Sequence, residues 1–211
     1  MKVCEIFSSI QGESSFSGSP CVFIRLTGCN LRCSYCDTAY AYDEGSDIKY
    51  SEIHERIKSF GIGMVEVTGG EPLLQEGTHS LIENLLDDGF RVLLETNGSM
   101  SIENVDKRAH IVLDIKTPSS KMSEKMYMKN LECISIKDDL KFVMSNREDY
   151  DWAERLVKEY ALTQKTNVFF SPVFGILDPG ILGQWIIRDR LGVRLGIQLH
   201  KFIYDPDKRR V

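Results

Sequence analysis

The sequence predicts an α/β protein in which parallel strands alternate with helices. Short apolar runs typical of buried strands recur along the 211 residues, and amphipathic runs with helical spacing separate them. Polar and glycine-containing motifs directly follow several of these apolar runs. Consecutive βαβ units of this kind build a partial (β/α) barrel or an open doubly wound sheet.

The predicted strands are short apolar segments of three to five residues. They cover residues 22–26, 64–67, 90–94, 111–115, 140–143, 168–170 and 195–198. Apolar stripes with helical spacing lie between them, and we expect these stripes to pack in the core. The stripes are Ile53, Ile57 and Phe60 after a cap at Ser51; Leu81, Ile82, Leu85 and Leu86 before Gly89; and Trp152, Leu156, Val157 and Tyr160.

The polar motifs stand where a functional site is expected in this fold class. They follow four predicted strands, as Thr27-Gly28-Cys29, Thr68-Gly69-Gly70-Glu71-Pro72, Glu95-Thr96-Asn97-Gly98 and Lys116-Thr117-Pro118. Ligands bind at the carboxyl ends of parallel strands, so we expect these motifs to meet. The sequence has no internal repeat, low-complexity segment or linker, so residues 1–211 are expected to form a single domain.

Composition narrows the possible partners and the compartment. A net charge of −5, from 26 basic and 31 acidic residues, argues against direct binding of nucleic acid. Glu5 interrupts any signal peptide, and no apolar run approaches the roughly 18 residues of a membrane span. We therefore expect a cytoplasmic protein without a membrane segment. Its six cysteines would stay reduced there, which favours metal binding or catalysis over disulfides.

Three cysteines form a compact cluster with spacings of three and two residues. Cys29, Cys33 and Cys36 predict a [4Fe–4S] cluster, which usually takes four cysteines. No fourth cysteine is near in sequence, so one iron could bind the amino and carboxylate groups of S-adenosylmethionine (SAM). A structural zinc site would need a fourth ligand, and no histidine is nearby in sequence. We expect the other three cysteines to be small buried hydrophobes: Cys4, Cys21 and Cys133.

The cysteine spacing, with Tyr35 before the last cysteine, resembles the signature of the radical SAM superfamily. The segment Gly69-Gly70-Glu71-Pro72 is similar to the glycine-rich SAM motif of that superfamily. The resemblance implies a partial (β/α) barrel of the radical SAM type, with a [4Fe–4S] cluster and SAM as cofactors. The residues that it implies for SAM binding are Tyr35, Asp37, Gly70, Glu71, Asn97 and Lys116. After Lys116 this chain has Thr117-Pro118, where many members have Ser-Pro-Lys.

Nearly the whole chain resembles the 7-carboxy-7-deazaguanine synthase family, beginning with the stretch Glu5 to Glu13. The resemblance implies a magnesium ligand at Thr38 and substrate contacts at Ile10, Gln11, Gly12, Glu13, Arg25, Thr68 and His200. An amide and a carboxylate suit the donor and acceptor edge of a pterin. Arg25 interrupts an apolar strand, where it could grip a substrate carboxylate or form a structural ion pair. Without the resemblance, the sequence around Gln11 and Glu13 would predict only a polar turn after a first strand.

The resemblance implies conversion of 6-carboxy-5,6,7,8-tetrahydropterin to 7-carboxy-7-deazaguanine with loss of ammonia. It further implies a magnesium ion, a flavodoxin or ferredoxin as electron donor, and a homodimer. Two other functions remain open at this point. An activase that makes a glycyl radical on a partner protein uses the same cysteine spacing, but would need a groove for a peptide. A non-catalytic Fe–S electron carrier would not cleave SAM.

Overall fold

Seven parallel strands form the part of the sheet that carries the site. The computed structural model describes residues 1–206 and 208–210. Its nine-stranded sheet has the order β3-β1-β2-β4-β5-β6-β7-β8-β9, and every pairing from β2 to β9 is parallel. The parallel strands confirm the α/β prediction and the partial (β/α) barrel. They are β2 (Pro20–Leu26), β4 (Met64–Gly69), β5 (Arg91–Thr96), β6 (His110–Asp114), β7 (Asp139–Met144), β8 (Asn167–Pro172) and β9 (Arg194–Leu195).

Two further strands lie at the N-terminal edge and were absent from the predicted set. β1 (Lys2–Ile10) is antiparallel to β2, and the two-residue β3 (Ser46–Asp47) is antiparallel to β1. Buried and less buried residues alternate along the first half of β1, with Glu5 among the buried ones. Because the charged Glu5 occupies a buried position, apolar and polar residues do not alternate regularly along β1, and the sequence pattern did not predict this strand. At the other edge, β9 is shorter than the predicted segment 195–198.

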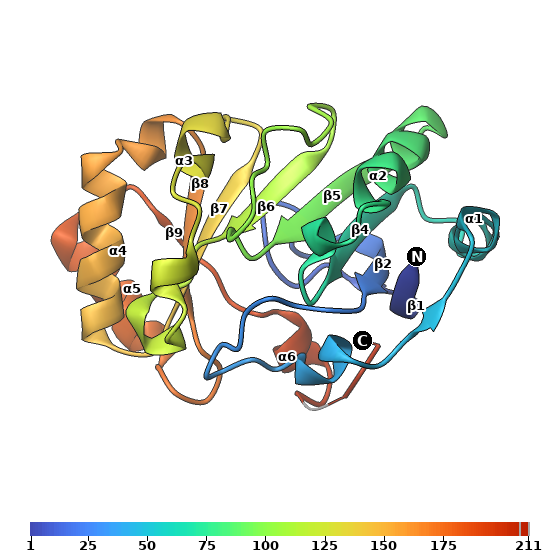
Figure 1. Ribbon diagram of the computed structural model, residues 1–211. Helices are drawn as coiled ribbons and strands as arrows, with labels where there is room; N and C mark the ends of the chain where they lie inside the picture. The colour runs from blue at the N-terminus through green and yellow to red at the C-terminus, as the bar shows by residue number, and fades with distance from the viewer. Residues whose placement is uncertain (207, 211) are drawn as a thin grey trace.

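The helices pack along the sheet as the apolar stripes predicted, with differences at their ends. The model contains α1 (Tyr50–Ser59), α2 (Thr78–Asp87), α3 (Asn130–Cys133), α4 (Arg147–Glu159), α5 (Pro179–Asp189) and α6 (His200–Ile203). Figure 1 shows α1 beside β1, α2 beside β4 and β5, α4 and α5 beside the last parallel strands, and the short α6 apart from them. No helix among the described residues is both long enough and apolar enough to cross a bilayer.

Three sequence-based predictions about these elements were wrong. The cap of α1 is Lys49, whose extended backbone starts the helix, while Ser51 lies within the first turn. Phe60 follows the last turn and remains 37% exposed instead of packing in the core. Cys133 is exposed at the end of α3 and Cys4 is partly buried, whereas Cys21 is fully buried as expected. Helix α5 was not predicted, although Asp178 caps it by accepting the N–H of Ile181 at 3.0 Å.

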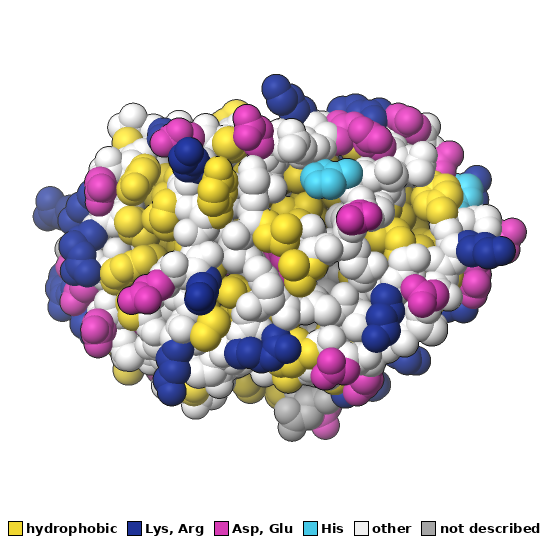
Figure 2. All heavy atoms as spheres, viewed as in Figure 1, with side chains coloured by type: hydrophobic (Ala, Val, Ile, Leu, Met, Phe, Trp, Pro, Cys, Tyr) yellow, Lys and Arg dark blue, Asp and Glu magenta, His cyan; other side chains and the backbone are white. Residues whose placement is uncertain are grey.

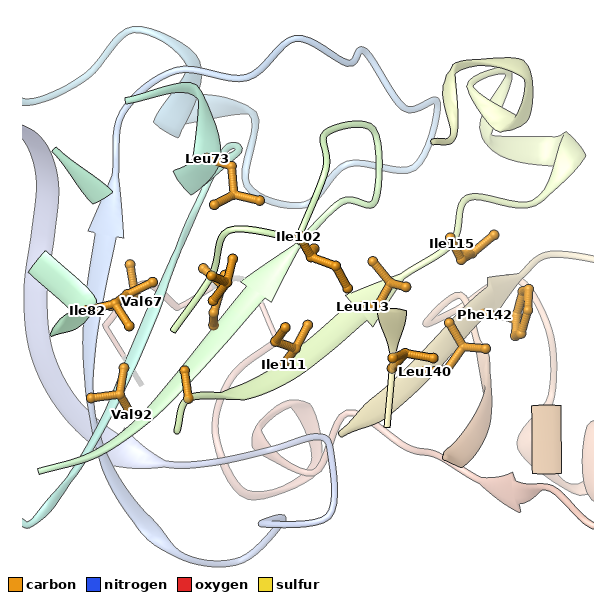
Figure 3. Packing of buried hydrophobic residues seen from close by; sticks show 14 of the residues in the cluster. Val67, Leu73, Ile82, Val92, Ile102, Ile111, Leu113, Ile115, Leu140 and Phe142 are labelled. Carbon is orange, nitrogen blue, oxygen red and sulfur yellow. The ribbon is translucent and has the colours of Figure 1, made fainter. Parts of the chain in front are cut away.

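The two faces of the sheet have different side chains. Residues that alternate along the strands pack against the helices in one hydrophobic core, as Figure 3 shows for Val67, Ile111, Leu113, Leu140 and Phe142. Successive side chains of a strand point to opposite faces. The residues between these core positions therefore face the interior of the partial barrel. Many of them are polar, namely Glu66, Thr68, Glu95, Asp114, Asp139 and Lys141.

The loop between β1 and β2 closes one end of this interior. The carboxylate of Asp139 accepts the backbone N–H of Ser15 at 2.7 Å and its hydroxyl at 2.6 Å. Phe16 packs edge-on against His110, at 4.9 Å between ring centroids, and belongs to a small apolar cluster around Leu93. Because Asp139 lies at the start of β7, the loop is anchored at the amino ends of the strands. The opposite, carboxyl ends remain available for the motifs that follow them.

Candidate active site

A loop that carries three cysteines follows β2 and contacts the ends of several other strands. The backbone N–H of Ser34 donates to the Ser120 carbonyl at 3.1 Å, which ties this cysteine loop (residues 27–38) to the segment after β6. The cysteines of the loop are all partly buried: Cys29, Cys33 and Cys36. The backbone N–H of Glu71 also donates to the Gly28 carbonyl at 2.8 Å, and Nδ2 of Asn97 to Sγ of Cys29 at 3.6 Å, so the motifs that end β2, β4 and β5 meet at one edge, as predicted.

The surroundings of Cys29 suit a sulfur ligand of an iron–sulfur cluster. Its Sγ lies 3.4 Å from the backbone nitrogen of Leu31 and 3.6 Å from Nδ2 of Asn97, both of which donate to it. N–H groups that point at sulfur tune clusters of this kind. Burial raises the pKa of the Cys29 and Cys33 thiols, so cluster binding would also release their protons. The residues present fit a [4Fe–4S] cluster.

The geometry does not favour a single metal ion. Within residues 1–206 and 208–210, no three Cys, His, Asp or Glu side chains are grouped so that they could hold one ion. A structural zinc ion needs four ligands around a single point. In a [4Fe–4S] cluster each thiolate binds a different iron, so the three sulfurs surround a larger body. The described residues therefore do not provide the four-ligand set of a structural zinc ion.

Glycine at position 70 lets the cysteine loop approach the end of β4. A Cβ at Gly70 would lie 2.7 Å from the Cβ of Cys29 and would also press on the Gly28 carbonyl. Such distances do not occur between real side chains, so any larger residue would displace the loop. The close approach places the Gly70 backbone directly beside the first cysteine, as expected for a residue that meets a ligand of the cluster.

Glu71 has a structural role that the sequence did not reveal. Its fully buried carboxylate accepts hydrogen bonds from the backbone nitrogens of Leu73, at 2.9 Å, and Asn97, at 2.7 Å. It also accepts from the hydroxyl of Thr96 at 2.9 Å. These bonds join the ends of β4 and β5, so the side chain of Glu71 is engaged within the protein. Any contact of Glu71 with SAM would come from its backbone.

Tyr35 and Lys116 lie on the side of the site formed by β6 and β7. The hydroxyl of Tyr35 donates to the Val143 carbonyl at 3.2 Å, and burial raises its pKa to about 12. Lys116 donates to Asp114 at 2.8 Å. Burial opposes the charge on Lys116, but the Asp114 carboxylate outweighs it and raises the pKa of the ammonium. Tyr35 belongs to the cysteine loop, and the Lys116 ammonium interacts electrostatically with Cys33 of that loop.

The side chain of Gln11 is engaged inside the protein. It is 4% exposed, its Nε2 donates to Glu66, and its Oε1 accepts the backbone N–H of Glu13. Burial, and then the nearby Glu95 carboxylate, raise the pKa of Glu66 well above its usual range. Gln11 therefore orients Glu13. Both ends of its amide already form hydrogen bonds within the protein, so few are available for a substrate.

Glu13 belongs to a buried network of charged groups around Lys141. The ammonium of Lys141 donates to Glu13 and to Glu95, at 2.6 Å each. Glu95 in turn accepts the hydroxyl of Thr68 at 3.0 Å, and Gln198 donates to Glu13 at 2.9 Å. We call the six side chains around this ammonium the interior polar cluster: Glu13, Glu66, Thr68, Glu95, Asp114 and Lys141.

Lys141 was not among the predicted site residues, and Glu95 was named only as part of the strand-end motif Glu95-Thr96-Asn97-Gly98. Lys141 interrupts the apolar segment 140–143 in the same way that Arg25 interrupts 22–26, so the sequence contained the same signal for both. A cavity of about 110 Å³ borders the cluster and is lined by Glu13, Lys141, Asp139, Phe169, Ser171 and Gly196 among others. The network thus has space beside it for part of a ligand.

Arg25 is in an ion pair, but its outer edge is not used. Its Nε donates to Glu5 at 2.9 Å, and Glu5 also accepts from the hydroxyl of Tyr40 at 2.8 Å and from Arg210 at 3.2 Å. In the described part of the chain, nothing accepts a hydrogen bond from the two terminal nitrogens of Arg25. Arg25 lies opposite Thr68 in the register of β2 and β4. The structural ion pair therefore exists and leaves a guanidinium edge available for a carboxylate.

The C-terminal segment packs against both the N-terminal stretch and the cysteine loop. The Leu199 backbone N–H donates to the Gly12 carbonyl at 2.8 Å, and a side chain at Gly12 would collide with the His200 ring. Lys201 donates to Asp37 at 2.6 Å. The segment that begins at His200 therefore closes the site over Gly12.

Thr38 and Ile10, the two remaining predicted residues, flank the site. The Thr38 hydroxyl donates to Asp37 at 2.9 Å, at the start of a short 3-10 helix that covers Ala39–Tyr42. Ile10 is the last residue of β1 and comes directly before the buried Gln11. The predicted residues thus lie around one site, and Asp37 contacts the C-terminal segment through Lys201.

Comparison with known proteins agrees with this geometry. The radical SAM superfamily matches residues 23–170. A 7-carboxy-7-deazaguanine synthase from Chlorobaculum tepidum is 45% identical, over all of this chain and 97% of the relative. One from Clostridium acetobutylicum is 43% identical, over all of this chain and 99% of the relative. The crystal structure of QueE from Escherichia coli shares the fold, with a TM-score of 0.78 at 21% identity over 94% of each chain.

The superfamily match covers the cysteine loop and the strands around it, and the full-length relatives also cover the N-terminal stretch and the C-terminal segment. Both parts of the site described above are therefore inside the matched regions. This chain belongs to the 7-carboxy-7-deazaguanine synthase family of the radical SAM superfamily.

Proposed function

We propose that this chain converts 6-carboxy-5,6,7,8-tetrahydropterin to 7-carboxy-7-deazaguanine with loss of ammonia. The reaction would serve 7-deazapurine biosynthesis of the queuosine or archaeosine type. One observation carries the proposal: a loop with three partly buried cysteines adjoins a buried cluster of charged groups on the inner face of the sheet. The names of the full-length relatives support the same reaction.

The cysteine loop is the proposed cofactor side of the site. Cys29, Cys33 and Cys36 would hold a [4Fe–4S] cluster and leave one iron for SAM. When bound, the cluster and SAM would supply the carbon-centred radical that takes a hydrogen atom from the substrate. The SAM contacts would come from the backbone of Gly70 and Glu71 and from the side chains of Tyr35, Asp37, Asn97 and Lys116.

The interior polar cluster and Arg25 are the proposed substrate side. The unused edge of Arg25 would bind the substrate carboxylate, and the Glu13 carboxylate would accept hydrogen bonds from the pterin ring. Thr68 and the backbone from Ile10 to Gly12 would complete the contacts, with Gln11 holding Glu13 in place. His200 would cover the ligand and exclude water, which protects a reactive intermediate.

We propose that Mg²⁺ binds to the hydroxyl oxygen of Thr38. Mg²⁺ favours oxygen ligands and keeps several waters, so one protein oxygen and substrate oxygens could suffice. Thr38 lies next to Asp37 at the edge of the cysteine loop, where its hydroxyl is partly accessible. The ion would orient the substrate between Thr38 and Arg25.

Further proposals concern the partners and the cell compartment. Residues 1–211 would act as one radical SAM domain, because a single sheet runs through the described strands. Flavodoxin or ferredoxin would donate the electron, and the chain would work as a cytoplasmic homodimer without direct binding of nucleic acid. Lys and Arg side chains are interspersed with Asp and Glu on the face seen in Figure 2, in keeping with the net charge of −5.

Anaerobic turnover tests the proposed function directly. Reconstituted protein, SAM, Mg²⁺, a reductant and the carboxypterin should yield 7-carboxy-7-deazaguanine and ammonia by mass spectrometry and an ammonia assay. Protein with Cys33→Ala is the control and should give neither. SAM cleavage without the deazaguanine product would refute the proposal, and net consumption of SAM on a peptide would favour an activase instead. A carrier of electrons would leave SAM intact.

A further inference from the structure

We infer that Lys141 is a positioning residue of the substrate site, on which Glu13 and Thr68 both depend. The inference rests on the proposed function, because it concerns residues that would contact the pterin. It adds a lysine on β7 to a site whose expected contacts lie on β1, β2, β4 and the C-terminal segment. The inference follows from the contacts, the burial and the charges around one ammonium group.

The side chain of Lys141 is largely shielded from water, and its ammonium is paired on several sides. Its side chain is 6% exposed, and it points away from the helices because its neighbours Leu140 and Phe142 lie in the core. It donates to Glu13 and Glu95 at 2.6 Å, and Asp114 lies 3.5 Å away. A buried cation is retained only where such partners replace its hydration.

The partners of Lys141 come from two separate parts of the proposed substrate site. Glu13 stands on the loop after β1, where its carboxylate is held by Lys141 and by the neutral amide of Gln198 at 2.9 Å. Glu95 lies on β5 and accepts a hydrogen bond from the Thr68 hydroxyl at 3.0 Å, so the position of the Glu95 carboxylate determines the orientation of Thr68. One ammonium therefore fixes a loop residue and a strand residue relative to each other.

Loss of this cation would change the charge of the whole cluster. Glu13, Glu95 and Asp114 would then face each other with Lys116 as the neighbouring cation, which is paired with Asp114 at 2.8 Å. Like charges at short range repel, and Glu13 has the most freedom to move because a loop carries it. A negatively charged substrate would also meet an excess of negative charge.

Lys141→Met tests the inference, since methionine keeps an unbranched side chain of similar shape, one atom shorter, without the charge. The carboxypterin should bind at least about tenfold more weakly by calorimetry, a loss of roughly 1.4 kcal/mol. SAM affinity and iron content should stay within about twofold, because their proposed ligands are elsewhere. Lys137→Met is the control, because Lys137 lies two residues before β7 and pairs with Asp138 at 2.6 Å, outside the cluster. It should bind both ligands like the wild type.

A double-mutant cycle separates positioning from general destabilisation. If Lys141 acts through Glu13, then Glu13→Gln/Lys141→Met should lose about as much pterin affinity as the more affected single variant. If the fold-loss in pterin affinity of the double variant equals the product of the losses in the two single variants, the two residues act independently, and the inference is overturned. Glu95→Gln/Lys141→Met removes one charge of each sign, and should fold and still bind the pterin weakly if Lys141→Met alone fails to fold.

Hydrogen exchange gives a readout that does not involve the pterin. In Lys141→Met, or in the charge-balanced double variant, the backbone N–H of Glu13, which donates to the side chain of Gln11, should exchange at least about tenfold faster. Lys137→Met should not change it. Unchanged protection would overturn the inference. If the wild type binds no carboxypterin, the proposed function fails, and this exchange experiment still decides whether Lys141 holds Glu13.

Discussion

The cysteine loop and the interior polar cluster adjoin each other in one site, but different parts of the chain build them. The loop is a single stretch, residues 27–38, whose three cysteines lie within eight residues of each other. The cluster draws its side chains from the loop after β1 and from β4, β5, β6 and β7. Backbone hydrogen bonds and one glycine hold the cysteine loop, whereas paired buried charges hold the cluster.

This difference indicates that the two regions should fail in different ways. Loss of a cysteine ligand from the loop should remove the cofactor and with it all activity. Loss of a side chain from the polar cluster should leave the cofactor in place and lower the affinity for the substrate. Four experiments test the comparison, from the largest expected effect to the smallest.

Removal of any loop cysteine should have the largest effect. Cys29→Ala, Cys33→Ala and Cys36→Ala should each lose the broad visible absorption, most of the iron and sulfide, and all turnover, since no other cysteine stands close enough in sequence to replace the ligand. Cys133→Ala is the control, because Cys133 is exposed at the end of α3. A cluster that required Cys4, Cys21 or Cys133 equally would contradict the model of an open iron.

Arg25→Ala should lower the affinity for the carboxylated pterin more than the affinity for a pterin without the carboxylate. Removal of the charged partner of a buried carboxylate should cost about 2–5 kcal/mol, which is roughly thirtyfold or more in affinity. A pterin without the carboxylate should lose much less. Calorimetry with both pterins makes the comparison. Equal losses for the two would mean that Arg25 serves only its ion pair with Glu5.

Gly70→Ala should disturb the contact between β4 and the cysteine loop. The added Cβ would overlap Gly28 and Cys29, so we expect a loss of about 1–3 kcal/mol in the free energy of unfolding. We also expect lower iron occupancy after reconstitution. Gly63→Ala is the matched control, because a Cβ at Gly63 meets nothing within 4 Å. Denaturant unfolding and iron analysis of both variants give the answer, and equal stability of the two would show that the loop can shift without cost.

Thr38→Ala should have the smallest effect of the four. It should keep the cluster and SAM affinity and lose most of the acceleration by Mg²⁺, while Thr38→Ser keeps the hydroxyl and the response. Initial rates across a range of Mg²⁺ concentrations measure it. An unchanged response in Thr38→Ala would place the metal at another oxygen.

The same contrast explains what the sequence could predict. The cysteine loop and the strand-end motifs are local patterns, so their positions after β2, β4, β5 and β6 were correct in advance. Contacts such as Gln11 with Glu66, or Lys141 with Glu13, join residues far apart in the chain. They depend on strand order and register, which a local pattern does not contain.

Individual errors have physical reasons of the same kind. The buried Glu5 made β1 look polar, and its partner Arg25 comes from the next strand. The sequence also did not show that the side chains of Glu71 and Gln11 bond to other strands within the protein. A polar residue in a motif can serve the scaffold or the ligand, and only its partners in space distinguish the two roles.

The division of the site into two regions can be tested most directly by titrating two variants with two ligands. Asn97→Ala removes the side chain that donates to Cys29, and Glu13→Gln removes the charge held by Lys141. We predict that Asn97→Ala lowers the affinity for SAM at least about fivefold, roughly 1 kcal/mol or more, and changes the affinity for the carboxypterin by no more than about twofold. Glu13→Gln should lower the affinity for the carboxypterin at least about fivefold and change the affinity for SAM by no more than about twofold. A loss of both ligands to the same extent in either variant would contradict the division and show that the cysteine loop and the polar cluster form one inseparable unit.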